Sequence, residues 1–416
     1  MPTVRFIPRG AEYRYYYKCL ERFFIGKQIK ALSLSVLAQC LVLVRQGSCP
    51  TIRRRKLLCI IGSALCIKSL YDRMTKKYVG TFYPTQCMQS FDEDLFFKMF
   101  RFRREHFNRV LTAMKLDGKS ILCGRKGTGS RNRAQHFPAD ICLLIVLRRM
   151  AFPCRFVDLV NVFGLPTNRI CDIYHSTVDF LYFKFARKLN RFEIWKEHFP
   201  AFAQAFRDFG APYDSLASIF DGHNVECCRP GGLGNLTSRV DQGELFSGEK
   251  ANHSVKYMVA QFPNGMTALS GPYKGSSHDA KCLRESLWTE ILHDIFLQTG
   301  RRFNIFGDAG FVVSEYVQAM VKGYGGYMFN EGRDFNNLMS RIRIYIENSF
   351  AGIANEFSYF SYSNGLRLGG RRFHRGYEVA NFLMNVRSTL YGNQFTDALR
   401  FRLLISLEDF LRMAEE

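Results

Sequence analysis

Four acidic residues in the second half of the chain stand where a carboxylate could bind a metal ion. Asp221 follows the apolar, β-favouring run L-A-S-I-F, and Asp308 follows F-N-I-F-G in the same way. Asp279 comes after the strand-like M-T-A-L-S-G. Glu347 lies at the edge of an apolar stripe with helical spacing, in S-R-I-R-I-Y-I-E-N-S-F-A-G-I. Each predicted element delivers one acid, although any one acid alone is equally typical of a turn, a cap or a solvated charge.

A cluster of these acids would need a cation. Two carboxylates about 4 Å apart repel by roughly 4 kcal/mol at an effective dielectric constant near 20. Ligands that are all oxygen favour Mg²⁺ or Mn²⁺ over zinc, and paired cations can hold the attacking and leaving oxygens of a phosphodiester. The acids therefore indicate a divalent metal site for phosphodiester chemistry.

The residues beside the acids predict how each is held. Gly222 would let the chain turn as soon as the strand ends at Asp221. His278 would cap the helix that follows it, with a phosphate contact as the alternative. Arg343 precedes Glu347 by four positions, so we expect the two to pair on the helix surface.

Six blocks in one order resemble a known family: the DDE endonuclease domain of Harbinger-type transposases and their domesticated nuclease relatives. The resemblance covers about Phe96 to Phe395 and is strongest from Ile219 to Ile353. The blocks are I-F-D-G-H-N-V-E-C-C-R-P-G-G, F-S-G-E-K-A-N-H-S, G-P-Y-K-G-S-S-H-D-A-K-C-L-R-E-S, F-G-D-A-G-F, F-N-N-L-M-S-R-I-R-I-Y-I-E-N-S-F-A-G and L-M-N-V-R-S-T-L-Y-G-N-Q-F. The chain departs from the family pattern at His223, where Thr is common, at Phe311, where Tyr is usual, and at Ala351, which separates the usual F-G pair; none of these removes an acid.

The resemblance implies an RNase H-like fold and a nuclease that uses Mg²⁺ or Mn²⁺. Its metal-binding carboxylates correspond here to Asp221, Asp279, Asp308 and Glu347. Asp221 would bridge two cations, Asp308 and Glu347 would each hold one, and Asp279 would be a further ligand or a support. The catalytic residues are then expected to be Asp221, Asp308 and Glu347.

The expected fold class is α/β: an RNase H-like domain with a mixed sheet flanked by helices, after an all-α region that resembles a helix-turn-helix. A meander of three strands, then helix, strand and helix, is the order such a sheet requires. We expect four parts: a basic extension over residues 1–95, the helical region over 96–205, the nuclease domain over 206–395, and a helical tail over 396–416. The tail from Phe395 reads as one amphipathic helix, and the Gly-rich stretch from Arg229 to Lys250 as a surface hairpin or loop.

Positive charge gathers in the N-terminal third. The formal net charge is +21, and residues 1–140 hold 27 Lys and Arg against 9 Asp and Glu, which leaves 31 against 28 for the rest. Such a field suits nucleic acid, although an acidic membrane surface would attract it too. The apolar run from Ala31 to Val44 has about 14 residues, short of the roughly 20 that span a bilayer. We therefore expect no membrane partner.

Two stretches are candidate DNA contacts. One is a loop rich in basic residues on a Gly-rich backbone, with a solvated loop as the alternative; its cations are Lys119, Arg125, Lys126, Arg131 and Arg133. The other is a pair of helices around Gly164, the second capped by Thr167 or Asn168, in which Arg169 would face a DNA groove. Plain helical packing is the competing interpretation of that pair.

These features predict a metal-dependent DNA endonuclease or transposase of the Harbinger type. The alternative is a domesticated, non-catalytic DNA-binding or scaffold protein that retains the fold. The expected partners are DNA and, by the resemblance, a separate Myb-like DNA-binding protein, with a homo-oligomer left open. The cluster Arg53 to Lys56 is consistent with nuclear import, so we expect the nucleus, with the cytoplasm left open. The 13 cysteines contain no C-x-x-C pair, which favours reduced thiols over a zinc site.

The charge asymmetry predicts that DNA affinity resides mainly in residues 1–140. If 6–10 phosphates are contacted, affinity should fall by roughly 10³–10⁵ between 50 and 200 mM salt. Neutralising the five loop cations together should weaken binding to all sequences alike and flatten the salt slope by up to about five units. Fluorescence anisotropy with unrelated duplexes measures both. An unchanged affinity and slope would show that the loop is only a solvated linker.

Overall fold

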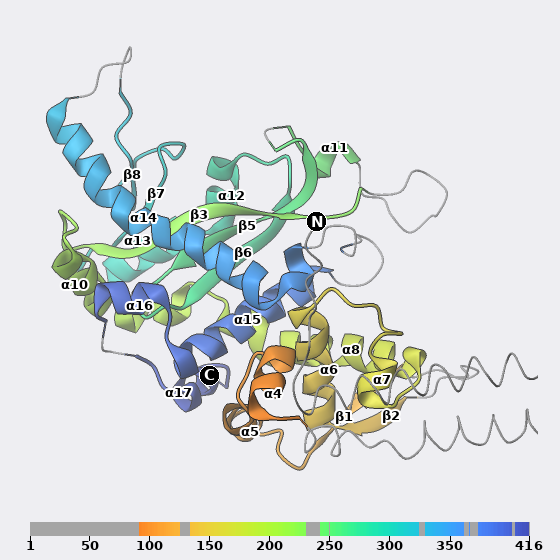
Figure 1. The fold of residues 1–416 in the computed structure, drawn as a ribbon. Coiled ribbons are helices and arrows are strands. Elements are labelled where there is room, and N and C mark those ends of the chain that lie inside the picture. The colour runs from red at the N-terminus through yellow and green to blue at the C-terminus, as the bar shows by residue number, and fades with distance from the viewer. Residues whose placement is uncertain are drawn as a thin grey trace, which may run out of the picture. The chain divides into compact units, whose positions relative to one another are not determined.

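The computed structural model describes residues 91–124, 134–229, 242–248, 250–323, 329–361, 366, 373–401 and 404–415. The described residues lie in one compact unit (Figure 1). The predicted extension over residues 1–95 lies almost wholly outside them, with the cluster at 53–56 and the apolar run at 31–44. Arg125, Lys126, Arg131 and Arg133 of the basic loop and most of the Gly-rich insertion also lie outside. No helix within the described ranges is both long and apolar enough to cross a membrane.

A mixed sheet of six strands forms the centre of the domain (Figure 1). Its path runs β4 (Phe246–Ser247), β5 (Asn252–Gln261), β3 (Leu216–Glu226), β7 (Asn304–Gly307) and β8 (Val317–Ala319), while β6 (Thr267–Lys274) also pairs with β5. The first three long strands form the predicted antiparallel meander, since β3 pairs with β5 and β5 with β6. β7 then joins β3 on its other side, and β7 and β8 both pair in parallel. The meander was predicted, whereas β8, which lies between β7 and the next helix, was not.

The first half of β3, most of β5 and the whole of β7 are buried on both faces, which explains their continuous apolar runs. On one face, α10 (Phe199–Phe209) and α14 (Asn330–Glu356) form a core with β3 and β7. Ile219, Phe306 and Ile346 are fully buried there. On the other face, α13 (Trp288–Thr299) brings Trp288 to 6.4 Å from the ring of Phe220. The predicted apolar stripe is confirmed, because α14 buries Ile342, Ile346 and Ile353. Glu347 itself, at the edge of the stripe, is exposed.

The helical region before the sheet is built around α6 (Ala139–Ala151), which is buried along almost its whole length. It packs against α4 (Glu93–Phe100) and against α8 (Thr167–Leu181), and α5 (Arg104–Ala113) follows α4. A π-helical turn, η1 (Tyr182–Ala186), extends α8. The short helix α9 (Arg187–Leu189) and the 3₁₀ turn η2 (Glu193–His198) then lead to α10.

This region packs on the sheet domain through α15 (Phe373–Tyr391), where Phe382 stacks on Phe185 at 5.5 Å. α12 (Asp279–Ser286) precedes α13 on the far face of the sheet. A short helix, α11 (Gln242–Leu245), precedes β4, and a 3₁₀ turn, η3 (Ser358–Ser361), follows α14.

Two local predictions in the helical region were wrong. α7 (Val160–Phe163) ends at Gly164 in the left-handed conformation, as expected, but α8 has Pro166 at its N-cap and no side-chain cap. A proline that pre-sets φ at the helix start takes the place of a capping side chain. The start of the predicted basic loop is instead β1 (Ser120–Cys123), paired with β2 (Gln135–Pro138).

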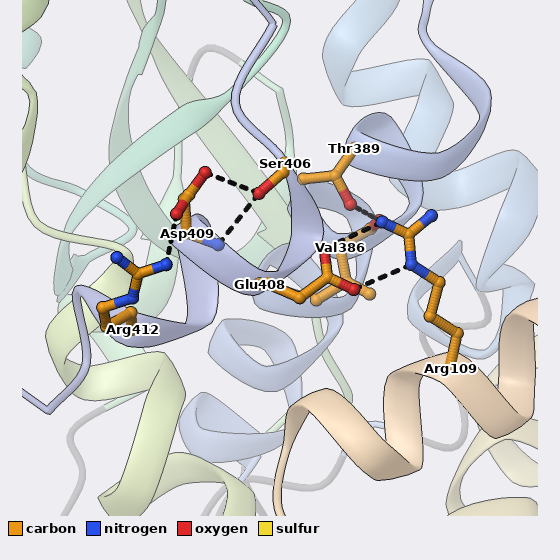
Figure 2. Close-up of polar contacts among 7 residues, drawn as sticks. All are labelled: Arg109, Val386, Thr389, Ser406, Glu408, Asp409 and Arg412. Atoms are coloured by element: carbon orange, nitrogen blue, oxygen red, sulfur yellow. Dashed lines mark hydrogen bonds and ion pairs between the residues drawn. The ribbon is translucent and has the colours of Figure 1, made fainter.

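The C-terminal segment forms two short helices, so the prediction of a single helix from Phe395 was wrong. α16 (Gln394–Leu399) ends at Arg400, whose φ of 50° is left-handed. α17 (Leu407–Arg412) begins afresh at Ser406, whose hydroxyl accepts a hydrogen bond from the Asp409 N–H. Figure 2 shows Arg109 of α5 donating two bonds of 2.8 Å to Glu408 of α17. Contacts with the helical region thus fix the orientation of the segment.

The packing of α14 predicts different contributions to stability from its buried and its exposed isoleucines. Ile346→Ala should lower the free energy of unfolding by about 2–5 kcal/mol, because Ile346 is fully buried in the core and its loss leaves a cavity. Ile344→Ala is the matched control: Ile344 lies on the same helix but is 52% exposed, so its change should stay within about 0.5 kcal/mol. Urea unfolding measures both. Equal losses would contradict the assigned face of α14.

Candidate active site

Asp221 lies in the interior of the central strand. We expected β3 to end at Asp221 and the chain to turn at Gly222, and this was wrong: β3 continues to Glu226, and Asp221 pairs with Val259 of β5. The reason is that β5 pairs with β3 from Ile219 to Glu226, so the ladder continues past the acid. The Asp221 side chain is only 15% exposed. A rigid, hydrogen-bonded backbone therefore positions this carboxylate.

Gly222 permits a close approach from the opposite face of the sheet. A Cβ at this position would lie 2.6 Å from Oδ1 of Asp279. Side chains alternate along a strand, so Asp279 approaches the face of β3 opposite to the one that Asp221 faces. Glycine is required here by the space that Asp279 occupies.

Asp279 is engaged by a buried lysine. Nζ of Lys256 lies 2.6 Å from Oδ1 of Asp279 and 2.7 Å from the Ser277 carbonyl oxygen, and the Lys256 side chain is only 8% exposed. His278 stands at the N-cap of α12, but its side chain makes no capping hydrogen bond, so that prediction was wrong. The N-terminus of α12 is instead held to β5 through Lys256, which the sequence did not single out.

Arg343 connects the two carboxylates on the α14 face. One of its Nη atoms lies 3.1 Å from Oε1 of Glu347 and 3.5 Å from Oδ2 of Asp221. The pairing with Glu347 was expected, but as a surface pair. α14 lies across the sheet, so the same guanidinium also reaches Asp221. Arg343 is the residue at this site whose role the sequence understated, and only the packing of α14 on the sheet could reveal it.

Asp308 arrives beside Asp221 because their strands are parallel neighbours. Ile219 pairs with Phe306, and the two acids come two positions later in each strand. Oδ1 of Asp308 accepts a hydrogen bond of 2.8 Å from the Gly310 N–H, which holds the turn after β7. A carboxylate at the end of one strand thus lies next to one in the middle of the other.

The electrostatics of Asp221 reflect this arrangement. Burial raises its pKa to about 6, although the hydrogen bond from Gly222 and the charge of Arg343 oppose the rise. Repulsion from Asp308 and, less strongly, from Asp279 contributes to the rise. The site therefore holds more negative charge than Arg343 alone neutralises.

His223 is a further buried group beside these acids. Its ring stacks on Phe350 of α14 at 4.4 Å, and burial lowers its pKa to about 4, with the charge of Lys250 adding to the effect. His223 is therefore neutral at pH 7 and packs the end of α14 onto the sheet. The sequence marked this position only as a departure from a family pattern.

The donor types suit a hard divalent cation, because Asp221, Asp308 and Glu347 offer only carboxylate oxygens. In the part of the chain that is described, no group of three or more His, Cys, Asp or Glu lies close enough together to hold a metal ion. Arg343 provides the positive charge between Asp221 and Glu347 in this arrangement. The carboxylates fit a cation in kind, and to converge on one they would require Arg343 to give way.

The predicted DNA-contact residues that the structure describes are Arg169 and Lys119, which belong to the helical region and not to the site of the acids. Arg169 is half-buried near the start of α8, and Lys119 is exposed just before β1, whereas the remaining loop cations lie outside the described residues. The seven cysteines that the described ranges contain are free thiols: Cys123, Cys142, Cys154, Cys171, Cys227, Cys228 and Cys282.

Part of the chain is similar to one family of known proteins. Residues 220–385 match the family of DDE superfamily endonucleases. The match supports the superfamily, and the mixed sheet with its flanking helices is consistent with such a nuclease domain. A domain of this superfamily suggests metal-dependent nuclease or transposase activity and implies DNA as the substrate. No curated protein and no solved structure matches the chain.

The raised pKa of Asp221 predicts a change in stability with pH in metal-free buffer. Its folded-state pKa of about 6 lies above the ordinary value of 3.8, so the folded state binds more protons between these pH values and stability falls as pH rises through them. Asp221→Asn should remove this loss and stabilise the protein at pH 8 by at most about 3 kcal/mol, at about 1.4 kcal/mol per pKa unit. Urea unfolding in EDTA at pH 4.5 and 8 measures the effect. A variant less stable than the wild type at pH 8 would contradict it.

Proposed function

We propose that the chain is a metal-dependent DNA endonuclease or transposase of the Harbinger type, with an RNase H-like catalytic domain. The observation that carries the proposal is the buried Asp221 on the central strand, beside Asp308 of the neighbouring parallel strand and joined through Arg343 to Glu347 of α14. Three antiparallel strands followed by two parallel ones, with helices on both faces, support the fold assignment.

Asp221, Asp308 and Glu347 would hold a divalent cation, Mg²⁺ or Mn²⁺. A cation bound there would activate water and stabilise charge on a phosphodiester. Arg343 would balance the carboxylates before the cation binds and would then be free to contact a phosphate oxygen, which guanidinium groups bind well. The domain boundaries proposed are 206–395 for the nuclease and 96–205 for the helical region that precedes it.

Asp279 has a supporting role in this proposal. It approaches the opposite face of β3 and neutralises the buried Lys256, so its carboxylate is already engaged. A buried lysine that loses its partner is costly, which explains an acid here without metal binding. Asp279 would thus hold α12 in place while the other three acids act on the substrate.

DNA binding would come from the basic N-terminal third, helped by a separate Myb-like partner, and the protein would act in the nucleus. The charge distribution supports the first point, because residues 1–140 carry most of the net positive charge, whereas Asp221, Asp308 and Glu347 repel DNA in the absence of metal. The alternative is a non-catalytic DNA-binding or scaffold protein with the same fold. The nicking experiment that follows distinguishes the two, because the alternative predicts no cleavage.

The proposal predicts that the full-length protein, with its partner if one is needed, nicks supercoiled DNA in Mg²⁺ or Mn²⁺ and not in EDTA. Asp221→Asn, Asp308→Asn and Glu347→Gln should each reduce nicking by about 10³-fold or more, because each retains side-chain volume and removes a ligand charge. Gel assays of relaxed and supercoiled plasmid measure the rate.

Two further variants complete this test. Asp294→Asn makes the same chemical change at an exposed position of α13 and should leave the rate unchanged. Asp279→Asn should retain activity while lowering thermal stability. Folded wild-type protein that fails to nick DNA in either metal would favour the non-catalytic alternative, and full activity in a ligand variant would remove that residue from the site.

A further inference from the structure

A cavity of about 460 Å³ lies beside the candidate active site, between α14, α15 and strands β5 and β6. Val259, which lines it, is the residue directly opposite Asp221 in the sheet, so both side chains belong to the same face. Asn348, also in its lining, follows Glu347 in α14. The volume lies within the roughly 300–1,000 Å³ of small-molecule sites. The cavity therefore adjoins the carboxylates on the face of the sheet that α14 covers.

The lining combines carboxamides with aromatic rings. Gln261, Asn348 and Asn355 contribute carboxamides, and Tyr345, Phe350 and Tyr391 contribute rings. The charged groups Arg387 and Glu356 form an ion pair of 2.9 Å and so largely cancel. A carboxylate in the wall disfavours a phosphate, and the many amides disfavour an apolar ligand. The lining suits a neutral, flat molecule with hydrogen-bonding edges.

Two polar atoms in the lining have no hydrogen-bond partner in the described structure. Gln261 is only 3% exposed, and its Oε1 is buried and unpaired. Arg387 is 8% exposed, and one Nη atom is likewise buried and unpaired. By contrast, Asn385 on the same wall is satisfied, since it accepts from the Thr267 N–H and donates to the Thr267 carbonyl, both at 2.9 Å. The walls of the cavity thus contain one unpaired acceptor and one unpaired donor; neighbouring atoms cover both, so a ligand would reach either atom only when its side chain turns into the cavity.

We propose that this cavity binds an unpaired nucleobase of the DNA substrate, next to the phosphodiester to be cut. Glutamine carboxamides and arginine guanidiniums are side chains that recognise base edges, and aromatic rings stack on bases that have left the helix. Removing a base from a duplex costs stacking energy, which a pocket next to the cut site can offset. That the base belongs to a DNA substrate rests on the proposed function. That the cavity binds a base rests only on the lining of the cavity.

The first experiment probes the cavity without DNA cleavage. Saturation-transfer NMR with the full-length protein in EDTA should show contact with at least one of the four deoxynucleosides. Gln261→Leu should weaken that contact about tenfold, because it removes the unpaired acceptor, and it should fold normally, because a buried acceptor without a partner contributes nothing to stability. Gln298→Leu makes the same change at an exposed position of α13 and should bind like the wild type. If no nucleoside binds, or if Gln261→Leu binds as the wild type does, the proposal is overturned.

A second experiment connects the cavity to DNA. Oligonucleotides with a single-stranded end, each carrying one abasic position, should show at least one position where loss of the base weakens binding about tenfold. Gln261→Leu should be insensitive to that position. Both measurements are made in EDTA, so a protein that binds the base yet never nicks DNA would refute the proposed function alone. A nuclease without a base preference would refute only the base site.

Discussion

The buried carboxylate of Asp221 in the central strand constrains the groups and elements that pack around it. Asp221 is almost enclosed, and moving its charge out of water raises its pKa to about 6. The Gly222 N–H and Arg343 partly offset that cost. Because Arg343 comes from α14, the helix must cross the sheet where its guanidinium can reach β3. The charge on one strand thus constrains the position of a 27-residue helix.

The alternation of side chains along β3 separates two tasks. Ile219 and Asp221 face α14, where the core and the candidate ligands lie, whereas Phe220 and Gly222 face α12 and α13. A small residue at Gly222 lets Asp279 come close enough to meet Lys256, so this ion pair secures the far face. A substitution on one face can therefore affect stability without reaching the chemistry of the other.

α14 also links the site to the helical region. Near its end, Glu356 forms ion pairs with both Arg387 of α15 and Arg101, which follows α4. Arg101 also donates to the Glu356 carbonyl at 3.0 Å. Within the lining of the cavity, Glu356 and Arg387 largely offset each other's charge. The preference proposed for a neutral base over a phosphate follows from that balance.

The amino-acid pattern was sufficient to locate the elements that carry the acids and their order along the chain. The runs before Asp221 and Asp308 could be recognised because a strand buried on both faces is apolar throughout, and the stripe around Glu347 because a helix buries side chains with a period of 3.6. The region of strongest resemblance, from Ile219 to Ile353, lies almost wholly within residues 220–385, which the family comparison matches. The end of β3 and the single C-terminal helix were mispredicted. Strand length depends on the partner strand, and the break at Arg400 is a left-handed residue that local propensity disfavours.

Which groups come into contact depends on how the elements pack together. The contact of Arg343 with Asp221, the approach of Asp279 to Gly222 and the pairing of Lys256 join residues 23 to 122 positions apart. No local pattern encodes such distances, because they depend on how α12 and α14 dock on opposite faces of one sheet. The same packing leaves Gln261 and Arg387 with unpaired atoms in a cavity, since a polar group reveals that it lacks a partner only when all its neighbours are in place.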